Sequence, residues 1–352
     1  MTVPFLEVEN LHVHFVGRQR LFASAMPTIK AVNGISFSIE RHRTFGLVGE
    51  SGSGKSTVAR AILQLADITA GTIRLGGVDV TNVRAHEELA FRKRVQAVLQ
   101  DPYSSLNQVH QVRTIVGDGI TRHFGIRPGP EREKRILSLL DEVGLTDDFL
   151  DRYPYEMSGG QRQRVSIARA LAVAPELIIA DEATSALDVS VQSQVLNVMK
   201  RVQADTGVAF LFIGHDLDVV RHVSDDIGVM YLGYLVEQGD ADGLHDSPAH
   251  PYTEMLIASV PVPDPAGQAD RRTLRRSFKR DSEPPSPADL PIGCPFASRC
   301  PFAMDICTEM MPTPTVARHG GHVRCHLHTS GPILAGESVV PYIRSASRSP
   351  SV

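Results

Sequence analysis

Residues 44–66 constrain the fold of this chain more than any other stretch. The apolar run TFGLVG at 44–49 is typical of a buried strand, and KSTVARAILQLA, from Lys55 onward, has the apolar spacing of a helix. Between them lies GESGSGKST, which matches the pattern G-x-x-x-x-G-K-[ST]. This pattern forms a phosphate-binding loop where it joins a strand to a helix. The stretch therefore predicts an α/β domain that binds a nucleoside triphosphate.

Each part of this loop has a chemical task in holding phosphates. Glycines let backbone N–H groups turn inward around phosphate oxygens, and the start of the following helix favours an anion. Lys55 brings a positive charge to the β- and γ-phosphates, and the Ser56 hydroxyl can ligate Mg²⁺. An ordinary loop of glycine and serine is the weaker alternative, because the flanking strand and helix are those that the motif requires. The expected ATP-binding residues are Gly49, Glu50, Ser51, Gly52, Ser53, Gly54, Lys55, Ser56 and Thr57.

Three other apolar runs end in polar residues that suit ATP hydrolysis. ELIIADE ends in Asp181 and Glu182, RVQAVLQ ends in Gln100, and VAFLFIG is followed by His215. Functional sites of α/β sheets gather at the carboxyl ends of strands. There Asp181 would hold Mg²⁺ through its water shell, and Glu182 would orient and polarise the attacking water. Gln100 could touch both metal and water, and His215 could contact the γ-phosphate, although each residue taken singly has a plain structural reading.

The stretch MSGGQRQRV indicates a second phosphate-binding helix start. Ser158 is a good N-cap, and Gly159 and Gly160 expose N–H groups where a long helix begins. One chain with two such sites has a simple explanation, in which the second serves the nucleotide on another subunit. We therefore expect Ser158, Gly159, Gly160 and Gln161 to bind ATP across a head-to-tail dimer. A capped helix with a flexible start is the structural alternative.

The rest of the pattern mixes strands with helices, which predicts an α/β core. Strands are expected at 5–15, 34–41, 44–49, 72–77, 94–100, 176–181, 208–214 and 226–239. Helices are expected at 131–144, 159–173 and 190–204. The net charge of −4 gives no general reason to expect a nucleic-acid partner. No apolar run approaches about 18 residues and the first residues do not resemble a secretory signal, so we expect a cytosolic protein without a membrane span.

Changes in composition suggest how the chain is divided. We expect a nucleotide-binding domain at 1–260, in which about 101–165 forms a helical subdomain with little strand character. The stretch 261–290 is rich in proline and arginine and reads as a linker whose basic cluster is solvated. A cysteine-containing region follows at 291–335, and 336–352 is expected to be a disordered tail.

All four cysteines fall in that last region, as Cys294, Cys300, Cys307 and Cys325. A cytosolic protein makes disulfides unfavourable. Structural zinc sites use tighter C-x2–4-C pairs than the C-x5-C-x6-C-x17-C spacing seen here, which favours an iron–sulfur cluster over Zn²⁺. Two alternatives stay open. One is unligated thiols, and the other is a mixed Cys/His zinc site with further ligands from His319, His322, His326 and His328.

Together these motifs resemble the nucleotide-binding subunit of an ABC transporter. Their order matches that family over about residues 5–255, from P-loop to signature to the strand ending at Asp181. The resemblance implies a P-loop NTPase core with an antiparallel β subdomain and a helical subdomain. It also implies a D-loop with Ser185 and Asp188, and an aromatic side chain that stacks on adenine near the end of the first strand. We expect Phe15 in that role, with Phe22 as the weaker choice.

Longer stretches narrow the resemblance to the ATPases of oligopeptide/dipeptide importers. These include LQDPYSSLN, RYPYEMSGGQRQRVSIARAL, SPAHPYTEMLIASVP and the tail pattern PPSPADLPIGCPFASRC. The likeness implies ATP-driven uptake of peptides, or sometimes of nickel or other small solutes, from the cytoplasmic face of the plasma or inner membrane. Partners would be a second ATP-binding subunit, two transmembrane permease subunits and an extracytoplasmic solute-binding protein. It also favours a [4Fe–4S] centre on the cysteines.

The chain departs from the usual family pattern at five positions, none of which removes a group with a proposed chemical role. These positions are His42, Gln108, Met157, Ala183 and Gly214. The main alternative function is a soluble ABC-class ATPase that acts on nucleic acid or the ribosome. Such proteins usually carry two cassettes, a long coiled coil or a basic surface, and this sequence has none of these features.

Overall fold

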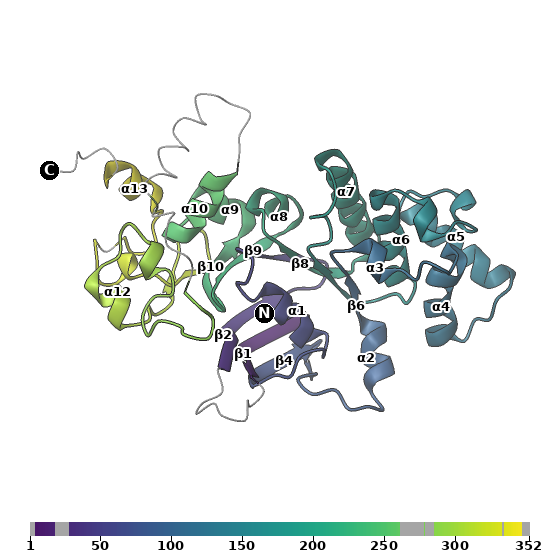
Figure 1. Cartoon of the computed structure of the whole chain (residues 1–352), viewed down its shortest axis with the longest axis horizontal. Coiled ribbons are helices and arrows are strands. Elements are labelled where there is room, and N and C mark those ends of the chain that lie inside the picture. Colours follow the sequence, from purple (N-terminus) through teal and green to yellow (C-terminus); the bar gives the residue numbers. More distant parts are fainter. Residues whose placement is uncertain (1–3, 18–27, 261–277, 279–284, 333, 347–352) are drawn as a thin grey trace.

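The computed structural model describes residues 4–17, 28–260, 278, 285–332 and 334–346. Within these ranges the strands form two sheets, one antiparallel and one mostly parallel (Figure 1). A helical region lies at one end of the molecule and the C-terminal residues at the other, with the two sheets between them (Figure 1). This arrangement confirms the α/β fold with an antiparallel subdomain and a helical subdomain.

The antiparallel sheet has the order β2-β1-β4-β5. Its strands are β1 (Leu6–Val16), β2 (Thr28–Ile39), β4 (Ala70–Leu75) and β5 (Val78–Asp79). Alternate residues of β1, such as Leu6 and Val8, are buried in one apolar cluster with Val58 of α1 (Lys55–Ile62). The alternating pattern at 5–15 therefore marks a strand with one face on the core.

The second sheet has the order β11-β12-β10-β9-β3-β8-β7-β6. Its members are β3 (Thr44–Val48), β6 (Val95–Val98), β7 (Leu177–Asp181), β8 (Ala209–Gly214), β9 (Asp226–Tyr231), β10 (Tyr234–Asp240), β11 (Thr315–Val316) and β12 (His322–Val323). The pairs β6/β7, β7/β8, β3/β8 and β3/β9 are parallel. Their carboxyl ends therefore meet at one edge, where the predicted catalytic residues follow the strands.

Helices cover this sheet and build the helical region. Around the sheet lie α2 (Glu88–Arg94), α7 (Val189–Thr206), α8 (Leu217–Val223), α9 (Ala241–Asp246) and α10 (Pro251–Ser259). The helical region holds α3 (Pro102–Ser105), α4 (Val112–Phe124), α5 (Pro130–Glu142), η1 (Asp147–Phe149), η2 (Pro154–Glu156) and α6 (Gly159–Leu171). Because α6 runs on to Leu171, the expected limit at 165 falls inside a helix. Among the residues described, no helix is long and apolar enough to cross a bilayer.

Two expectations were wrong in detail. The run 226–239 is a hairpin of β9 and β10 rather than one strand, because Leu232 and Gly233 adopt φ of 45° and 85° and turn the chain. The expected disordered tail also holds the helix α13 (Val340–Ala346), and Val339 and Ile343 are fully buried. Apolar anchors thus order the tail as far as 346, and residues 347–352 lie outside the described ranges.

The C-terminal residues are built onto the cassette instead of forming a separate body. Strand β12 pairs with β10. The short elements η3 (Ala297–Arg299), α12 (Asp305–Glu309) and η4 (His326–His328) contribute side chains to the same apolar cluster as the core helices. The Glu237 carboxylate is fully buried and lies 2.9 Å from Nε2 of His319. It also accepts hydrogen bonds from the backbone N–H groups of Ala249 and His250. Of these contacts, the one with His319 joins the extension to β10, and the others satisfy the rest of the buried carboxylate.

Candidate active site

The P-loop joins β3 to α1, as the motif requires. Gly54 begins the helix with φ of 104°, and a Cβ atom there would lie 2.2 Å from the Ala31 carbonyl oxygen. At Gly49 a Cβ atom would lie 2.1 Å from the Met230 carbonyl oxygen. Only glycine fits such close backbone contacts. No side chain caps α1, so its first N–H groups have no side-chain acceptor.

Lys55 is buried inside this loop. Its Nζ donates hydrogen bonds to the carbonyl oxygens of Gly49 and Glu50, both at 2.8 Å, and lies 3.3 Å from Ser53 Oγ. Burial lowers the pKa of Lys55, and the carboxylates of Glu182, Asp181 and Glu50 act in the opposite direction. The loop encloses a cavity of about 200 Å³. Its lining residues are Ile29, Ala31, Ser51, Gly52, Gly54, Lys55, Ser56, Thr57, Glu182 and Pro287.

Beside the loop, a hydroxyl and a carboxylate lie as a pair. Ser56 Oγ donates a hydrogen bond of 3.0 Å to Asp181 Oδ1, although 125 residues separate them in sequence. Burial raises the pKa of Asp181, and the Ser56 hydrogen bond partly opposes that effect. Two hard oxygen donors at the edge of a phosphate-binding loop are the ligands that Mg²⁺ prefers. The donor set therefore fits the expected metal.

Glu182 follows the same strand and is held by two other predicted residues. Gln100 Nε2 donates to Glu182 Oε2 at 2.9 Å and to Ser185 Oγ at 3.2 Å. Glu182 adopts φ of 49°, a left-handed conformation that costs about 1–3 kcal/mol in a non-glycine residue and is common at active sites. His215 and Glu182 line one adjoining cavity of about 90 Å³. The sheet edge thus gathers these residues although they are far apart in the sequence.

The signature residues stand apart from this edge. Ser158 caps α6: its Oγ accepts from Gln161 N at 3.3 Å, and its own N–H donates to Gln161 Oε1 at 2.9 Å. None of the four residues 158–161 lines either cavity. Gly160 has a packing role as well, because a Cβ atom there would lie 2.3 Å from Val191 Cγ1. Within one chain, the two expected phosphate-binding helix starts are separate sites.

Comparison with known proteins decides the family. The model described as "ABC transporter" matches residues 32–185, and the model for the oligopeptide/dipeptide transporter C-terminal region matches residues 236–307. The oligopeptide transport ATP-binding protein AppF of Bacillus subtilis (strain 168) is 45% identical over 92% of this chain and 97% of its own. The putative oligopeptide transport ATP-binding protein YkfD of the same organism is 45% identical over 93% and 96%. The chain belongs to the ATP-binding proteins of the oligopeptide/dipeptide ABC transporters.

Solved structures agree with this assignment of the fold. The ATP-binding cassette MJ0796, seen as a dimer bound to ADP and phosphate, aligns with a TM-score of 0.58 and 26% identity over 67% of this chain and 98% of its own. CbiO1 of Clostridium perfringens aligns with a TM-score of 0.60 and 25% identity over 70% and 92%. The shared part is the cassette, because neither alignment reaches three quarters of this chain.

Phe15, the residue expected to stack on adenine, does not itself line the P-loop cavity. Phe15 is 43% exposed near the end of β1 and pairs with Ile29 of β2, which does line the P-loop cavity. The rival Phe22 lies outside the described residues. Sequence reasoning missed Ile29 and Ala31, and it also missed Pro287, whose carbonyl accepts from Lys30 N at 3.2 Å. No local motif marks these residues, since the fold brings them to the loop.

Two departures from the family pattern have physical explanations. His42 adopts φ of 63°, the left-handed conformation that glycine adopts without strain, which explains why glycine is frequent at that position. Gly214 lies where a Cβ atom would come within 2.7 Å of Val220 Cγ2, so the serine usual in the family would need a smaller neighbour here. Neither change touches Lys55 or Glu182.

The cysteines lie within the C-terminal extension as free thiols. Burial raises the pKa of Cys294 to about 11 and that of Cys300 to about 12, and it raises the pKa of Cys325 well above its usual value. Cys294 and Cys307 are held side by side, because Cys294 N donates to the Cys307 carbonyl oxygen at 2.8 Å. Nevertheless, across the described ranges no three His, Cys, Asp or Glu residues are placed to hold one metal ion.

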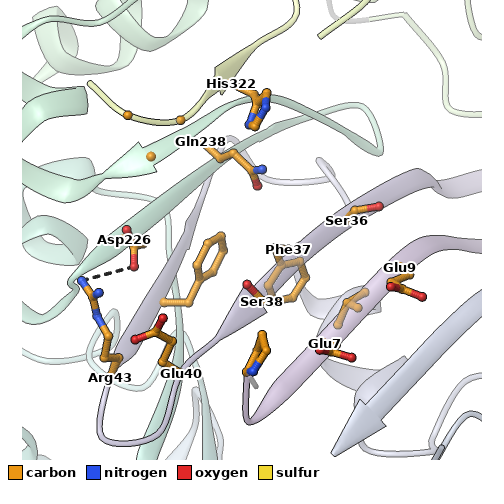
Figure 2. A pocket seen from close by; sticks show the side chains of 16 residues that line it. Glu7, Glu9, Ser36, Phe37, Ser38, Glu40, Arg43, Asp226, Gln238 and His322 are labelled. Carbon is orange, nitrogen blue, oxygen red and sulfur yellow. Dashed lines mark ion pairs between the residues drawn. The ribbon is translucent and has the colours of Figure 1, made fainter. Parts of the chain in front are cut away.

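A larger cavity, of about 580 Å³, shares no lining residue with the P-loop cavity. Figure 2 shows this larger cavity from close by. It is lined by both sheets and by residues 320–322 of the extension. Its carboxylates include Glu7, Glu9 and Glu40, and Arg43 forms an ion pair of 3.4 Å with Asp226 (Figure 2). No predicted ATP-binding or catalytic residue lines this cavity, so size alone does not identify the active site.

Proposed function

We propose that this chain hydrolyses ATP to drive peptide import through a membrane transporter. The observation that carries the proposal is the sheet edge where Lys55, the Ser56–Asp181 pair and the Gln100–Glu182 pair meet. The named relatives are oligopeptide transport proteins, and these names support peptides as the solute. The family resemblance supports a site of action at the cytoplasmic face of the membrane.

Each residue at the edge has a distinct task in the proposed reaction. The P-loop N–H groups and Lys55 hold the β- and γ-phosphates, for which Lys55 exchanges its carbonyl partners for phosphate oxygens. Ser56, Asp181 and Gln100 would hold Mg²⁺, which supplies positive charge to the phosphates when bound. Glu182 orients water and accepts its proton as the oxygen attacks the γ-phosphorus. The bond to ADP breaks, and ADP and phosphate are released. His215 contacts the γ-phosphate beside Glu182.

The signature residues complete the site on a second subunit. We place one ATP between the P-loop of one subunit and residues 158–161 of the other, with Ser185 and Asp188 of the D-loop near that interface. The separation of the two helix starts within one chain supports this arrangement, as does the dimeric form of MJ0796. The full assembly would contain a second ATP-binding subunit, two permease subunits and a solute-binding protein. Phe15 would stack on adenine beside Ile29.

The proposed division of the chain follows the same logic. Residues 1–260 form the ATP-binding cassette, 261–290 link it to the extension, and 291–335 hold the cysteines. We propose that these cysteines bind a [4Fe–4S] cluster, with Zn²⁺ as the alternative. Because no three of them are placed to share a metal, binding requires local rearrangement, and the proposed hydrolysis uses no step through the cluster. Iron, zinc and sulfide analysis of anaerobically purified protein tests this, and the absence of both metals and of sulfide would refute it.

Glu182→Gln tests the proposed reaction most simply. The amide keeps the shape of the side chain but accepts no proton, so we expect ATP turnover to fall about 100-fold or more while ATP binding persists. Glu176→Gln, one residue before the start of the same strand and outside the lining of the P-loop cavity, is the matched control and should retain turnover. Turnover is measured as phosphate release by the full-length chain in the assembled transporter. Uptake of labelled peptides into cells should fall in parallel, and unchanged phosphate release would reject the assignment.

A further inference from the structure

One side chain of the C-terminal extension reaches the P-loop itself. Arg299 donates two hydrogen bonds to the Glu50 carboxylate, from Nη1 to Oε2 at 2.6 Å and from Nη2 to Oε1 at 2.9 Å. The two residues lie 249 positions apart in the sequence. The Arg299 side chain is only 12% exposed and that of Glu50 is 33% exposed. This paired, partly desolvated geometry is the strong form of an arginine–carboxylate contact.

Glu50 connects this arginine to the lysine that binds phosphate. Its carbonyl oxygen accepts the 2.8 Å hydrogen bond from Lys55 Nζ. Its backbone N–H donates to Tyr252 Oη at 2.9 Å. The carboxylate, the carbonyl and the N–H of one P-loop residue are therefore each fixed, and the carboxylate is fixed by the extension. A shift of Glu50 would move an acceptor that sets the position of Lys55.

The charge of Glu50 gives Arg299 a second task. A carboxylate in a loop that receives a triphosphate repels the ligand unless a cation neutralises it. Arg299 supplies that cation, and its hydrogen bonds to Glu50 raise the arginine pKa further. The rings of Tyr231 and Phe296 lie 5.7 Å and 5.8 Å from its guanidinium carbon, so apolar walls hold it in place.

The backbone that carries Arg299 is tied to the cysteine region. Arg299 ends the short helix η3, which lies between Cys294 and Cys300. Ala297 N donates to Cys294 O at 3.0 Å, and Cys300 N donates to Ala297 O at 3.3 Å. Pro287, in the linker that precedes the extension, lines the P-loop cavity. The segments that follow the cassette therefore meet the nucleotide site at two places.

We infer that Arg299 is a positioning residue of the ATP site, supplied by the C-terminal extension. It neutralises Glu50 and holds that residue where its carbonyl orders Lys55 in the nucleotide-free loop, before Lys55 turns to the phosphate oxygens. ATP affinity then depends on the extension being in place, although the extension lies far from the catalytic carboxylates in sequence. The inference rests on ATP binding at the P-loop as proposed above.

Arg299→Gln tests the inference in the full-length protein. We expect the Kd and KM for ATP with Mg²⁺ to rise roughly five- to twentyfold, since the pair is only partly shielded from water. The turnover number should change less than twofold, because Glu182 and Gln100 are untouched. Arg299→Lys keeps the charge without the bidentate contact, so its Kd for ATP should lie between those of the wild type and Arg299→Gln. Arg318→Gln is the matched control, because it breaks the exposed Arg318–Glu337 pair of the same extension.

A double variant separates positioning from general stability. In Glu50→Gln with Arg299→Gln no unpaired carboxylate faces the triphosphate, so we expect ATP affinity to recover by at least threefold over Arg299→Gln alone. Thermal unfolding without nucleotide reports on the fold. If Arg299→Gln does not fold, Arg299→Lys and the double variant carry the test.

The outcomes distinguish this inference from the proposed function. Wild-type protein that binds no ATP would overturn the function itself. Wild-type protein that binds ATP, together with an Arg299→Gln Kd within twofold of it, would overturn the inference. A lowered melting temperature with unchanged Kd would assign Arg299 a purely structural role and would also overturn it. An equal rise of the Kd for ATP in the control Arg318→Gln would also overturn the inference.

Discussion

The helices α1 and α6 both begin with backbone N–H groups that lack partners within the helix, and the two starts differ in what surrounds those groups. At α1, Gly54 offers no side-chain cap, so the first N–H groups remain for a ligand, and Lys55, Asp181 and Glu182 surround them. At α6, Ser158 and Gln161 cap each other reciprocally, and the P-loop cavity does not include them. We propose that the first start binds ATP within its own chain. The second is capped and ordered, and we propose that it becomes a site only beside the nucleotide of another subunit.

The largest expected effect comes from removing the cation at the α1 site. Lys55→Ala deletes the charge and the donors that would turn to the β- and γ-phosphates, so we expect ATP affinity to fall about 100-fold or more. Thr57 remains in the loop and gives a matched control as Thr57→Ser, which should bind nearly as wild type. Equilibrium binding of labelled ATP measures both. Near-normal binding by Lys55→Ala would remove the basis for distinguishing the two helix starts.

Changing the α6 start should leave binding intact and stop the reaction. Ser158 is exposed at the N-cap, so Ser158→Arg fits its own chain but places a bulky side chain where the partner's γ-phosphate is expected. We expect ATP turnover to fall roughly 50-fold, as for the loss of oriented charge-stabilising donors, while binding changes less than twofold. Ser158→Ala, which loses only the cap, should reduce turnover far less. Parallel loss of binding and turnover would contradict the division of roles.

The smallest effect concerns stability at the metal edge. The pKa of Asp181 is raised in the folded protein, so its ionised form opposes folding above the unfolded pKa and does not do so below it. Asp181→Asn should therefore raise the melting temperature of nucleotide-free protein by about 2 °C at pH 7, with the gain shrinking as the pH falls towards 4. Melting curves at several pH values check this. A lower melting temperature at pH 7 would show that the carboxylate stabilises the site.

Motifs made the α1 edge predictable, while the extension needed the three-dimensional fold. Short sequence patterns of a few residues are enough to predict the P-loop, the pair Asp181 and Glu182, and the cap at Ser158. Loop geometry and strand ends fix the surroundings of each one. The hairpin at Leu232–Gly233 was missed because two buried strands in sequence form one continuous apolar run. Arg299 was missed because its partner Glu50 lies 249 residues away in the sequence, and no sequence motif contains both residues.

The most direct test of the account uses the transporter assembled with its own subunits. ATP bound by this chain is measured with a photoreactive ATP that labels it, and turnover is measured in the same preparation, for wild type, Lys55→Ala and Ser158→Arg. The account predicts that Lys55→Ala loses the label, whereas Ser158→Arg keeps the label and loses turnover. Wild-type turnover in Ser158→Arg, or loss of label in both variants, would contradict the claim that each ATP is held by the α1 start of one subunit and the α6 start of another.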